Sequence, residues 1–442
     1  MRASVLRLTS MTDLNAEGWA APVATGPLDA HLVIPGSKSL TNRELVLSAL
    51  ADSPSTLDAP LVARDTTLMA DALRALGATI DASSPTSWRI TPAAFHGGAT
   101  IDAGLAGTVM RFIPPVAALA DGPVTIDGDA HARKRPMATT IDALRSLGIA
   151  VDDDGRGALP FTIHGDGVIE GGELTIDASA SSQFVSGLLL AAPRFRDGLV
   201  LRHAGERLPS LPHIEMTIAT LARRGVTVTS PEPTTWVVEP GQIAGAAIAI
   251  EPDLSNAGPF LAAALLAGGR VTIGGWPATT TQVGDLFATL LPRFGPTVTR
   301  SAEGLTVDGG DGFRSGRTWE GVDLDLSEGG ELSPTFAALA ALATTASRIT
   351  GIGHLRGHET DRLAALATEL NGLGGRVTEL PDGLAFEPAP LHGGAWAAYA
   401  DHRIATTGAL LGLVVDGVVV DDIGTTAKTL PEFPALWAEL VG

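Results

Sequence analysis

The chain contains no cysteine and a single tyrosine, and aromatic residues make up only 5% of its 442 residues. Without thiols it has no disulfides, no thiolate metal ligands and no cysteine nucleophile. Hydrophobic residues reach 45%, yet their runs are too short or too interrupted to span a bilayer. The first 23 residues lack a continuous apolar core and a cleavage-like end, so we expect no export signal. These absences predict a cytoplasmic protein without a membrane partner.

Basic residues are also scarce, because 30 Lys and Arg face 49 Asp and Glu, for a net charge of −19. A general nucleic-acid or anionic-membrane binder needs a basic surface, so we exclude both partners. The basic residues sit in short motifs rather than in runs. That is how a local pocket for a small anion is built into an acidic protein.

A repeated pattern organises the rest of the chain. Helix-like runs end at Gly77, Gly148, Gly225, Gly295 and Gly374, which are 71, 77, 70 and 79 positions apart by subtraction. Glycine adopts the left-handed conformation that closes a helix, and two β-prone runs separated by turn residues follow each one, as in a hairpin. The fixed period predicts one supersecondary unit, helices on a small sheet, used repeatedly.

The length is too great for one core and predicts two domains of about three repeats each. For a sixth unit, we expect the C-terminal run 418–437 to be completed by an N-terminal strand at 30–35. No element is expected in residues 1–27.

Four motifs in the first half place glycines, hydroxyl residues or cations near a helix start: PGSKSLTNR (35–43), AGLAGTVMR (103–111), RKRPM (133–137) and SASSQF (179–184). Free backbone N–H groups and the positive helix end favour anions there. Each motif alone also fits a capped helix, a packing turn or a solvated charged face. The GxxxxGK[ST] spacing of a nucleotide phosphate loop is missing.

The second half adds HETDR (358–362), YADHR (399–403) and TAKT (426–429). The first of these also fits a helix cap with an exposed ion pair, and His402 alone is more often structural than a ligand. No spacing of His, Asp or Glu is typical of a metal site, so we predict neither a metal nor a cofactor.

Taken together, PGSKSLTNR, LAGTVMR, RKRPM, SSQF, HETDRL, DHR and TAKT, in this order between about Leu28 and Leu440, resemble the 5-enolpyruvylshikimate-3-phosphate synthase family. The resemblance implies an α/β (α+β) fold, a two-domain inside-out α/β barrel with three βαβαββ units in each domain. It also implies two crossings between the domains, near Pro35 and near Glu251-Pro252. Residues 1–35 with 252–442 would then form a discontinuous C-terminal-type domain, 36–251 an N-terminal-type domain, and the cleft between them the active site.

The resemblance implies a transferase of the shikimate pathway of aromatic amino acid biosynthesis, acting as a monomer. It would move the enolpyruvyl group of phosphoenolpyruvate to the 5-hydroxyl of shikimate 3-phosphate and release phosphate. An alternative is the same chemistry on a nucleotide sugar, as in the UDP-N-acetylglucosamine enolpyruvyl transferases, whose members commonly use a cysteine that this chain lacks. A non-catalytic repeat scaffold is a third reading, but it would need neither two carboxylates nor so many cationic positions.

The site residues below are those that the resemblance implies. The catalytic groups are Glu331 as base near the 5-hydroxyl, Glu359 for the proton at C3, and Lys38 with Lys428 to stabilise developing charge. Phosphoenolpyruvate would be bound by Lys38, Gly107, Arg135, Gln183, Arg362, Arg403 and Lys428. Shikimate 3-phosphate would be bound by Lys38, Ser39, Arg43, Ser181, Ser182, Gln183, Ser210, Glu331 and His358. The commoner pattern has Tyr, Asn, Lys and Asp where this chain has His213, His354, His358 and Glu331.

Overall fold

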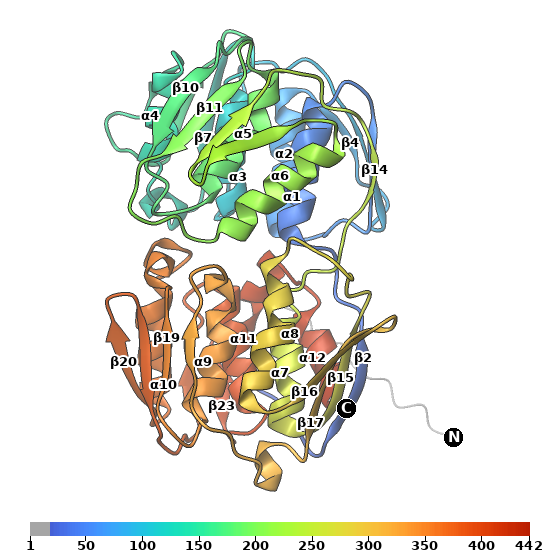
Figure 1. The fold of residues 1–442 in the computed structure, drawn as a ribbon, viewed down its shortest axis with the longest axis vertical. Helices are drawn as coiled ribbons and strands as arrows, with labels where there is room; N and C mark the ends of the chain where they lie inside the picture. Colours follow the sequence, from blue (N-terminus) through green and yellow to red (C-terminus); the bar gives the residue numbers. More distant parts are fainter. Residues whose placement is uncertain (1–17) are drawn as a thin grey trace.

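The computed structural model describes residues 18–442, which form two lobes stacked along the long axis of the molecule (Figure 1). The elements from α1 (Lys38–Leu50) to β14 (Ala247–Ala249) build one lobe, called here the upper lobe. The elements from α7 (Gly258–Ala267) to the C-terminus and the N-terminal strands build the other, the lower lobe. The upper lobe has three four-stranded sheets, and the lower lobe has two four-stranded sheets and one three-stranded sheet within the described residues.

In the upper lobe, each unit runs strand, helix, strand, helix and hairpin. One unit comprises β6 (Thr100–Asp102), α3 (Gly107–Ala117), β7 (Pro123–Asp127), α4 (Ala138–Ser146), β8 (Ala150–Asp152) and β9 (Phe161–His164). The next comprises β10 (Gly172–Ile176), α5 (Gln183–Ala191), β11 (Leu199–His203), α6 (Leu211–Arg223), β12 (Val228–Glu232) and β13 (Thr235–Val238). The remaining unit comprises α1 (Lys38–Leu50), β3 (Ser55–Asp58), α2 (Arg64–Leu76), β4 (Thr79–Asp81) and β5 (Ser87–Thr91), with β14 (Ala247–Ala249) as its first strand.

The lower lobe repeats this plan. One unit comprises β18 (Asp323–Asp325), α9 (Ser333–Ala341), β19 (Ser347–Thr350), α10 (Arg362–Gly372), β20 (Arg376–Leu380) and β21 (Gly383–Glu387). A second comprises β2 (Leu28–Leu32), α7 (Gly258–Ala267), β15 (Gly269–Gly274), α8 (Phe287–Leu290), β16 (Thr297–Ser301) and β17 (Gly304–Gly310). The third comprises β22 (Gly394–Trp396), α11 (His402–Gly412), β23 (Val418–Val420), α12 (Phe433–Val441) and β1 (Trp19–Ala20). The predicted fold of βαβαββ units is confirmed.

The five glycines that set the period all have positive φ, with values of 124°, 86°, 82°, 95° and 92° in chain order. Each is followed by an antiparallel hairpin, namely β4–β5, β8–β9, β12–β13, β16–β17 and β20–β21. A side chain at such a φ costs energy that glycine avoids, which is why the repeat is visible in the sequence.

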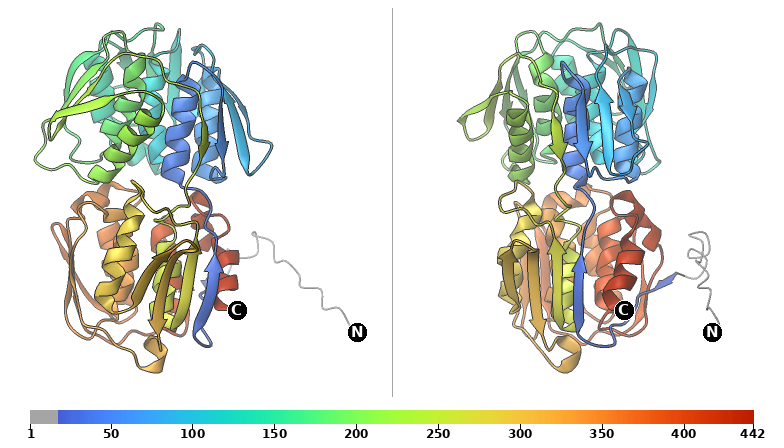
Figure 2. Two further views of the ribbon diagram at one scale, coloured as in Figure 1. Left: turned by 45° about the vertical axis from the view of Figure 1, so that its right-hand side comes forward. Right: turned by 90° about the vertical axis from the view of Figure 1, so that its right-hand side faces the viewer.

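The prediction for the sixth unit was wrong in its N-terminal partner. The strand expected at 30–35 is β2, which pairs in parallel with β15 of another unit. Figure 2 shows β2 lying along that sheet. The sixth sheet is completed instead by β1, where Trp19 and Ala20 pair with Val420 and Val419. Residues 18–27 therefore contain an element that was not expected, while residues 1–17, including most of the segment searched for an export signal, lie outside the described residues.

The first helix of each unit lies inside its lobe, and the sheets lie outside. Nearly every residue of α1, α3 and α5 is buried, as are those of α7, α9 and α11, and the helices of each set contact one another. A helix that is apolar on all sides is typical of such an interior. Among residues 18–442, no helix combines the length and apolarity needed to cross a bilayer.

The lobes have separate hydrophobic cores, one within residues 45–243 and one within 21–34 and 254–440. The chain passes between them at two adjacent points, where Gly36 and Pro252 form an antiparallel bridge. Ser37 N–H donates to Glu251 O at 2.7 Å, and Asp253 N–H donates to Pro35 O at 2.9 Å. The domain boundaries at 35/36 and 251/252 stay a prediction, which these contacts favour.

A buried ion pair joins α1 to the end of α6. Arg224 donates to Glu44 Oε2 from Nη2 at 2.7 Å and from Nε at 3.0 Å, and both side chains are fully buried. Replacing Glu44 by Ala leaves the guanidinium buried without its partner, so we expect a loss of about 3–5 kcal/mol of folding free energy. Chemical unfolding checks this, with Glu215→Ala on the exposed face of α6 as the control. Equal stability of the two variants would contradict it.

Candidate active site

A cavity between the lobes is lined by the starts of inner helices from both sides. In the upper lobe these are Lys38 of α1, Gly107 of α3 and Gln183 of α5. The lower lobe contributes Arg362 of α10 and His402 of α11. The positive ends of several helices therefore meet at one place, which favours an anionic ligand.

The structure brings together ten of the fifteen residues implied by the resemblance. Lining the cavity are Lys38, Ser39, Gly107, Arg135, Gln183, Glu331, His358, Glu359, Arg362 and Arg403. Arg43, Ser181, Ser182, Ser210 and Lys428 are not among the residues that line it. The ligand contacts and catalytic roles of all fifteen stay predictions.

Gly107, Arg135 and Gln183 form a compact group in the upper lobe. A Cβ at Gly107 would lie 3.1 Å from Gln183 Oε1 and 3.3 Å from Arg135 Nη1, so only glycine leaves the space between them open. Gln183 Oε1 and Arg135 Nε are buried and have no hydrogen-bond partner among the described residues. Buried polar atoms are normally paired, so this group is arranged for a partner outside the chain.

Glu359 lies between two cations of the lower lobe. Lys428 Nζ lies 2.5 Å from Glu359 Oε1, and Arg362 Nη2 lies 3.0 Å from Oε2. Burial would raise the pKa of the Glu359 carboxyl, but Lys428, Arg362 and Arg135 outweigh burial and hold the pKa well below its usual range. Lys428 also donates to Leu105 O across the lobes at 3.3 Å, and this links the lower lobe to the turn before α3.

Arg362 is buried. The alternative interpretation of its motif, a helix cap with an exposed ion pair, therefore does not describe this side chain. Its Nε donates to Asp401 Oδ2 at 2.7 Å, and both side chains are at most 2% exposed. Asp361, the preceding residue, caps α10 by accepting from Ala364 N–H at 3.1 Å. The motif therefore both caps the helix and holds a guanidinium in the cavity wall.

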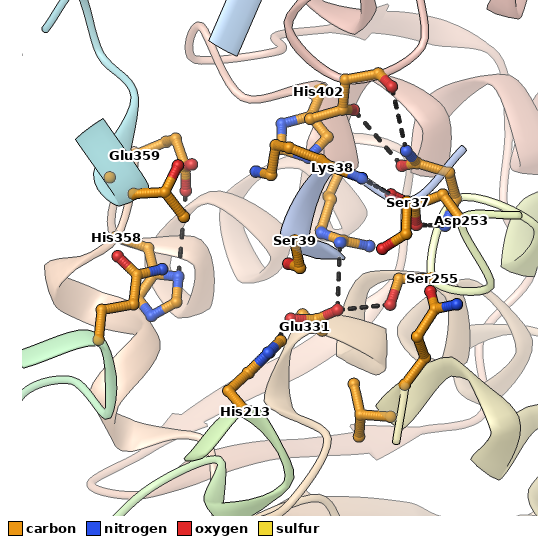
Figure 3. Close-up of a pocket in the computed structure, with 18 of the residues that line it drawn as sticks. Ser37, Lys38, Ser39, His213, Asp253, Ser255, Glu331, His358, Glu359 and His402 are labelled. Carbon is orange, nitrogen blue, oxygen red and sulfur yellow. Dashed lines mark hydrogen bonds and ion pairs between the residues drawn. The ribbon is translucent and has the colours of Figure 1, made fainter. Parts of the chain in front are cut away.

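Glu331 receives three donors (Figure 3). His213 Nε2 lies 2.8 Å from Oε2, while Ser255 Oγ donates to Oε1 and Arg403 Nη2 lies 3.5 Å from the same oxygen. Burial would raise the pKa of Glu331, but His213 and Arg403 hold it well below the usual range. Glu331 belongs to the 3₁₀ turn Gly330–Leu332 of the lower lobe, and His213 to the first turn of α6 in the upper lobe.

Lys38 and Arg43 both belong to α1, but the side chain of Arg43 makes more hydrogen bonds within the protein than that of Lys38. Lys38 Nζ lies 3.5 Å from Asp65 Oδ2 and keeps 19% of its side chain exposed. Arg43 is buried and donates to Thr217 Oγ1, Ser39 O and His213 O at 2.8–2.9 Å. Burial lowers the pKa of Arg43 to about 9. In this arrangement Arg43 supports the cavity wall from behind.

His358 lines the cavity, whereas Ser181, Ser182 and Ser210 do not. Ser182 precedes α5 without making a capping bond, and Ser181 Oγ accepts from Gln183 N–H at 3.3 Å. Ser210, in the left-handed region at φ 53°, donates its N–H to Ser327 O across the lobes at 3.2 Å. Burial, helped by Arg362, lowers the pKa of His358 well below its usual range, so this imidazole is neutral.

Among the lining residues that sequence reasoning did not select as site residues are Asp253, Ser255, Asn256 and His402. Asp253 accepts from the N–H groups of Lys38 and Asn256 at 3.1 and 3.0 Å, and burial raises its pKa. Neither ring nitrogen of buried His402 has a hydrogen-bond partner among the described residues, so a hydrogen-bonded structural role does not account for this histidine. Their position in the sequence could have identified Asp253–Asn256. These residues follow the second crossing between the lobes and precede α7, just as Ser37 and Lys38 follow the first crossing at the start of α1.

Within residues 18–442 no group of three or more His, Asp or Glu side chains is arranged to hold a metal ion. Two carboxylates of the cavity, Glu331 and Glu359, are paired with cations.

We expect Gly107→Ala to weaken phosphoenolpyruvate binding without unfolding the protein. The φ of Gly107 is not positive, so the new methyl group strains no backbone and acts only by filling the space beside Gln183 and Arg135. Loss of one charge-assisted hydrogen bond, about 1.5–3 kcal/mol, raises KM for phosphoenolpyruvate roughly 10- to 150-fold. Steady-state kinetics check this, with Gly241→Ala, where nothing lies near the added methyl, as the control. A KM equal to that of the control would contradict the expectation.

Comparison with known proteins identifies the family to which this chain belongs. A family model described as EPSP synthase (3-phosphoshikimate 1-carboxyvinyltransferase) matches residues 23–437. A protein of Kocuria rhizophila named 3-phosphoshikimate 1-carboxyvinyltransferase is 57% identical over 437 residues, 96% of each chain. The solved EPSP synthase of Acinetobacter baumannii is 23% identical, covers 96% of this chain and 98% of its own, and has a TM-score of 0.78. The enolpyruvyl transferase NikO of Streptomyces tendae is 18% identical, covers 95% and 96%, and has a TM-score of 0.73. These two structures share the fold, and the family match together with the 57% identical relative shows that the chain belongs to the EPSP synthase family.

Proposed function

We propose that this chain transfers the enolpyruvyl group of phosphoenolpyruvate to the 5-hydroxyl of shikimate 3-phosphate and releases phosphate. The observation that carries the proposal is the relative from Kocuria rhizophila, named for this activity and 57% identical over nearly the whole chain. The cavity supports it, because Glu331 and Glu359 lie there among four cations from both lobes, Lys38, Arg135, Arg362 and Arg403, and Lys428 pairs with Glu359.

Phosphoenolpyruvate carries a carboxylate and a phosphate, so its site needs several fixed donors. We propose that Gly107, Arg135 and Gln183 bind it from the upper lobe, and Arg362, Arg403 and Lys428 from the lower. Three features support this: the open space at Gly107, the unpaired atoms of Arg135 and Gln183, and the buried position of Arg362. Charge-assisted bonds of this kind are about twice as strong as neutral ones.

We propose that shikimate 3-phosphate binds beside Lys38, Ser39, Glu331 and His358. Ser181, Ser182 and Ser210, together with Arg43 and Gln183, complete the set implied by the family pattern. Of these, Arg43 has three of its five N–H donors engaged by the protein, which leaves two for a ligand. A neutral His358 contributes a hydrogen bond rather than a charge.

The proposed reaction is an addition followed by an elimination. The 5-hydroxyl oxygen forms a bond to C2 of phosphoenolpyruvate, C3 gains a proton, and a tetrahedral intermediate results. Loss of a proton from C3 and cleavage of the C2–O bond to phosphate complete the transfer. Glu359 is proposed for the proton at C3, and Lys38 with Lys428 for the charge on the departing phosphate.

A phosphate-release assay tests the function. We expect release only when phosphoenolpyruvate and shikimate 3-phosphate are both present. Release with UDP-N-acetylglucosamine but not with shikimate 3-phosphate would instead support the alternative enolpyruvyl transfer. No release with either acceptor, from a protein shown by circular dichroism to be folded, would overturn the proposal.

We further propose a cytoplasmic monomer whose two domains are 36–251 and 1–35 with 252–442. One chain supplies the cavity wall from both lobes, so no second copy is required to complete it. Sedimentation analysis at micromolar concentration checks the oligomeric state, and a dimer under those conditions would contradict it.

A further inference from the structure

His213 is held firmly at the start of α6, with its side chain in the wall of the cavity. Its backbone carbonyl accepts from Arg43 Nη2 at 2.9 Å and from Thr217 Oγ1 at 3.0 Å. Only 14% of the His213 side chain is exposed. The imidazole is therefore fixed in place and opens toward the site, not toward bulk solvent.

The contact with Glu331 decides which ring nitrogen of His213 is free. Nε2 lies 2.8 Å from Glu331 Oε2, and an ionised carboxylate only accepts hydrogen bonds. Nε2 must therefore carry the hydrogen. In a neutral imidazole Nδ1 then has a lone pair, and no hydrogen bond between described residues uses that nitrogen.

Glu331 itself is poorly suited to accept a proton. Its Oε1 takes the donors of Ser255 and Arg403, and its Oε2 takes that of His213. The pKa of this carboxyl is held well below its usual range despite burial. A carboxylate that is stabilised in this way is a weak base, but it is a good partner for an imidazole that becomes positively charged.

We propose that His213, not Glu331, is the general base that takes the proton of the 5-hydroxyl, with Glu331 as its positioning residue. This inference rests on the proposed function. The O–H bond of the acceptor breaks, its electron pair forms the new O–C2 bond, and Nδ1 gains the proton. The imidazolium returns the proton to solvent, and the departing phosphate takes one up, so protons balance over the cycle.

The pair is assembled from both lobes, since His213 belongs to the upper lobe and Glu331 to the lower one. Figure 3 shows the two side chains reaching toward each other below Ser39. The charged and titratable groups around them include Lys38 and Arg43 of α1, Asp253, Arg362 of α10, Arg403 of α11 and His354 of the 3₁₀ turn Gly353–Gly357. The base therefore acquires its orienting carboxylate only where the lobes meet.

The first test is His213→Gln, whose side-chain amide still donates to Glu331 but cannot take up a proton. We expect kcat for phosphate release to fall by 100-fold or more, while the dissociation constant of shikimate 3-phosphate changes less than about threefold. His164→Gln, at an exposed position on β9, is the control and should retain wild-type kcat. If His213→Gln keeps more than a tenth of the wild-type kcat, Glu331 is the base and the proposal is wrong.

The second test is His213→Ala supplied with imidazoles of different basicity at equal free-base concentration. We expect rescue of kcat that grows with the basicity of the added imidazole, which a purely structural role would not produce. No rescue by any imidazole, in a variant that still binds shikimate 3-phosphate by calorimetry, would overturn the proposal. If the wild-type protein turns over shikimate 3-phosphate, the proposed function holds. A negative result in either test then counts only against His213 as the general base.

Discussion

We expect turnover to fall about 30- to 1000-fold when Lys38 is replaced by Ala, with the fold retained. Lys38 is the first residue of α1, where Ala is a good helix former, and Ser37 still caps the helix by accepting from Leu40 N–H. Its ammonium group is partly exposed to the cavity, and we propose that it contacts the reacting phosphate. Removing one such contact costs about 2–4 kcal/mol of transition-state stabilisation, which gives the stated range.

Steady-state phosphate release and a thermal unfolding curve check this expectation together. Lys134→Ala is the matched control, because Lys134 is exposed and does not line the cavity. Turnover of Lys38→Ala within threefold of that control would remove Lys38 from the proposed catalytic groups.

The second large effect is expected for Glu359→Gln, which keeps the shape of the side chain and removes its charge and basicity. We expect kcat to fall about 10²- to 10⁴-fold, the range for a proton-transfer group. Phosphoenolpyruvate should bind as tightly as before or more tightly, because its negative charge meets Lys428 and Arg362 without a competing carboxylate.

Single-turnover kinetics and calorimetric titration with phosphoenolpyruvate separate these two quantities. Glu379→Gln, which removes a surface carboxylate paired with Arg356 at 2.8 Å, serves as the control. If affinity for phosphoenolpyruvate is lost in parallel with kcat, Glu359 supports binding and not proton transfer.

The parts of the fold that could be predicted are those determined by residues close together in the sequence. A glycine at positive φ closes a helix within its own unit, and a hairpin needs only the turn between its strands, so Gly77 and its four counterparts carried the repeat. The partner of the sixth sheet could not be predicted in this way. β1 has two residues, too few for a pattern, and its pairing with Val419 and Val420 depends on how the N-terminal segment runs over the lower lobe.

The residues of the site also divide into those that local sequence predicts and those that it does not. Lys38, Gly107 and Gln183 could be selected because each begins a helix within a recognisable motif. The pairing of His213 with Glu331 could not, since 118 positions separate them and only packing of the lobes brings the side chains within 2.8 Å. Asp253 was missed for the same reason, because the backbone N–H of Lys38 that it accepts from lies 215 positions away.

The adjacent crossings at Gly36 and Pro252 also bear on the order in which the chain folds. β2 and β15 pair although residues 36–251 lie between them, and closing so long a loop early is slow and entropically costly. Once residues 36–251 have folded, their two ends lie side by side, and β2 needs to find a strand that is already near. Folding of residues 36–251 therefore brings β2 and β15 together. Although β2 is made early on the ribosome, it is among the last strands to pair.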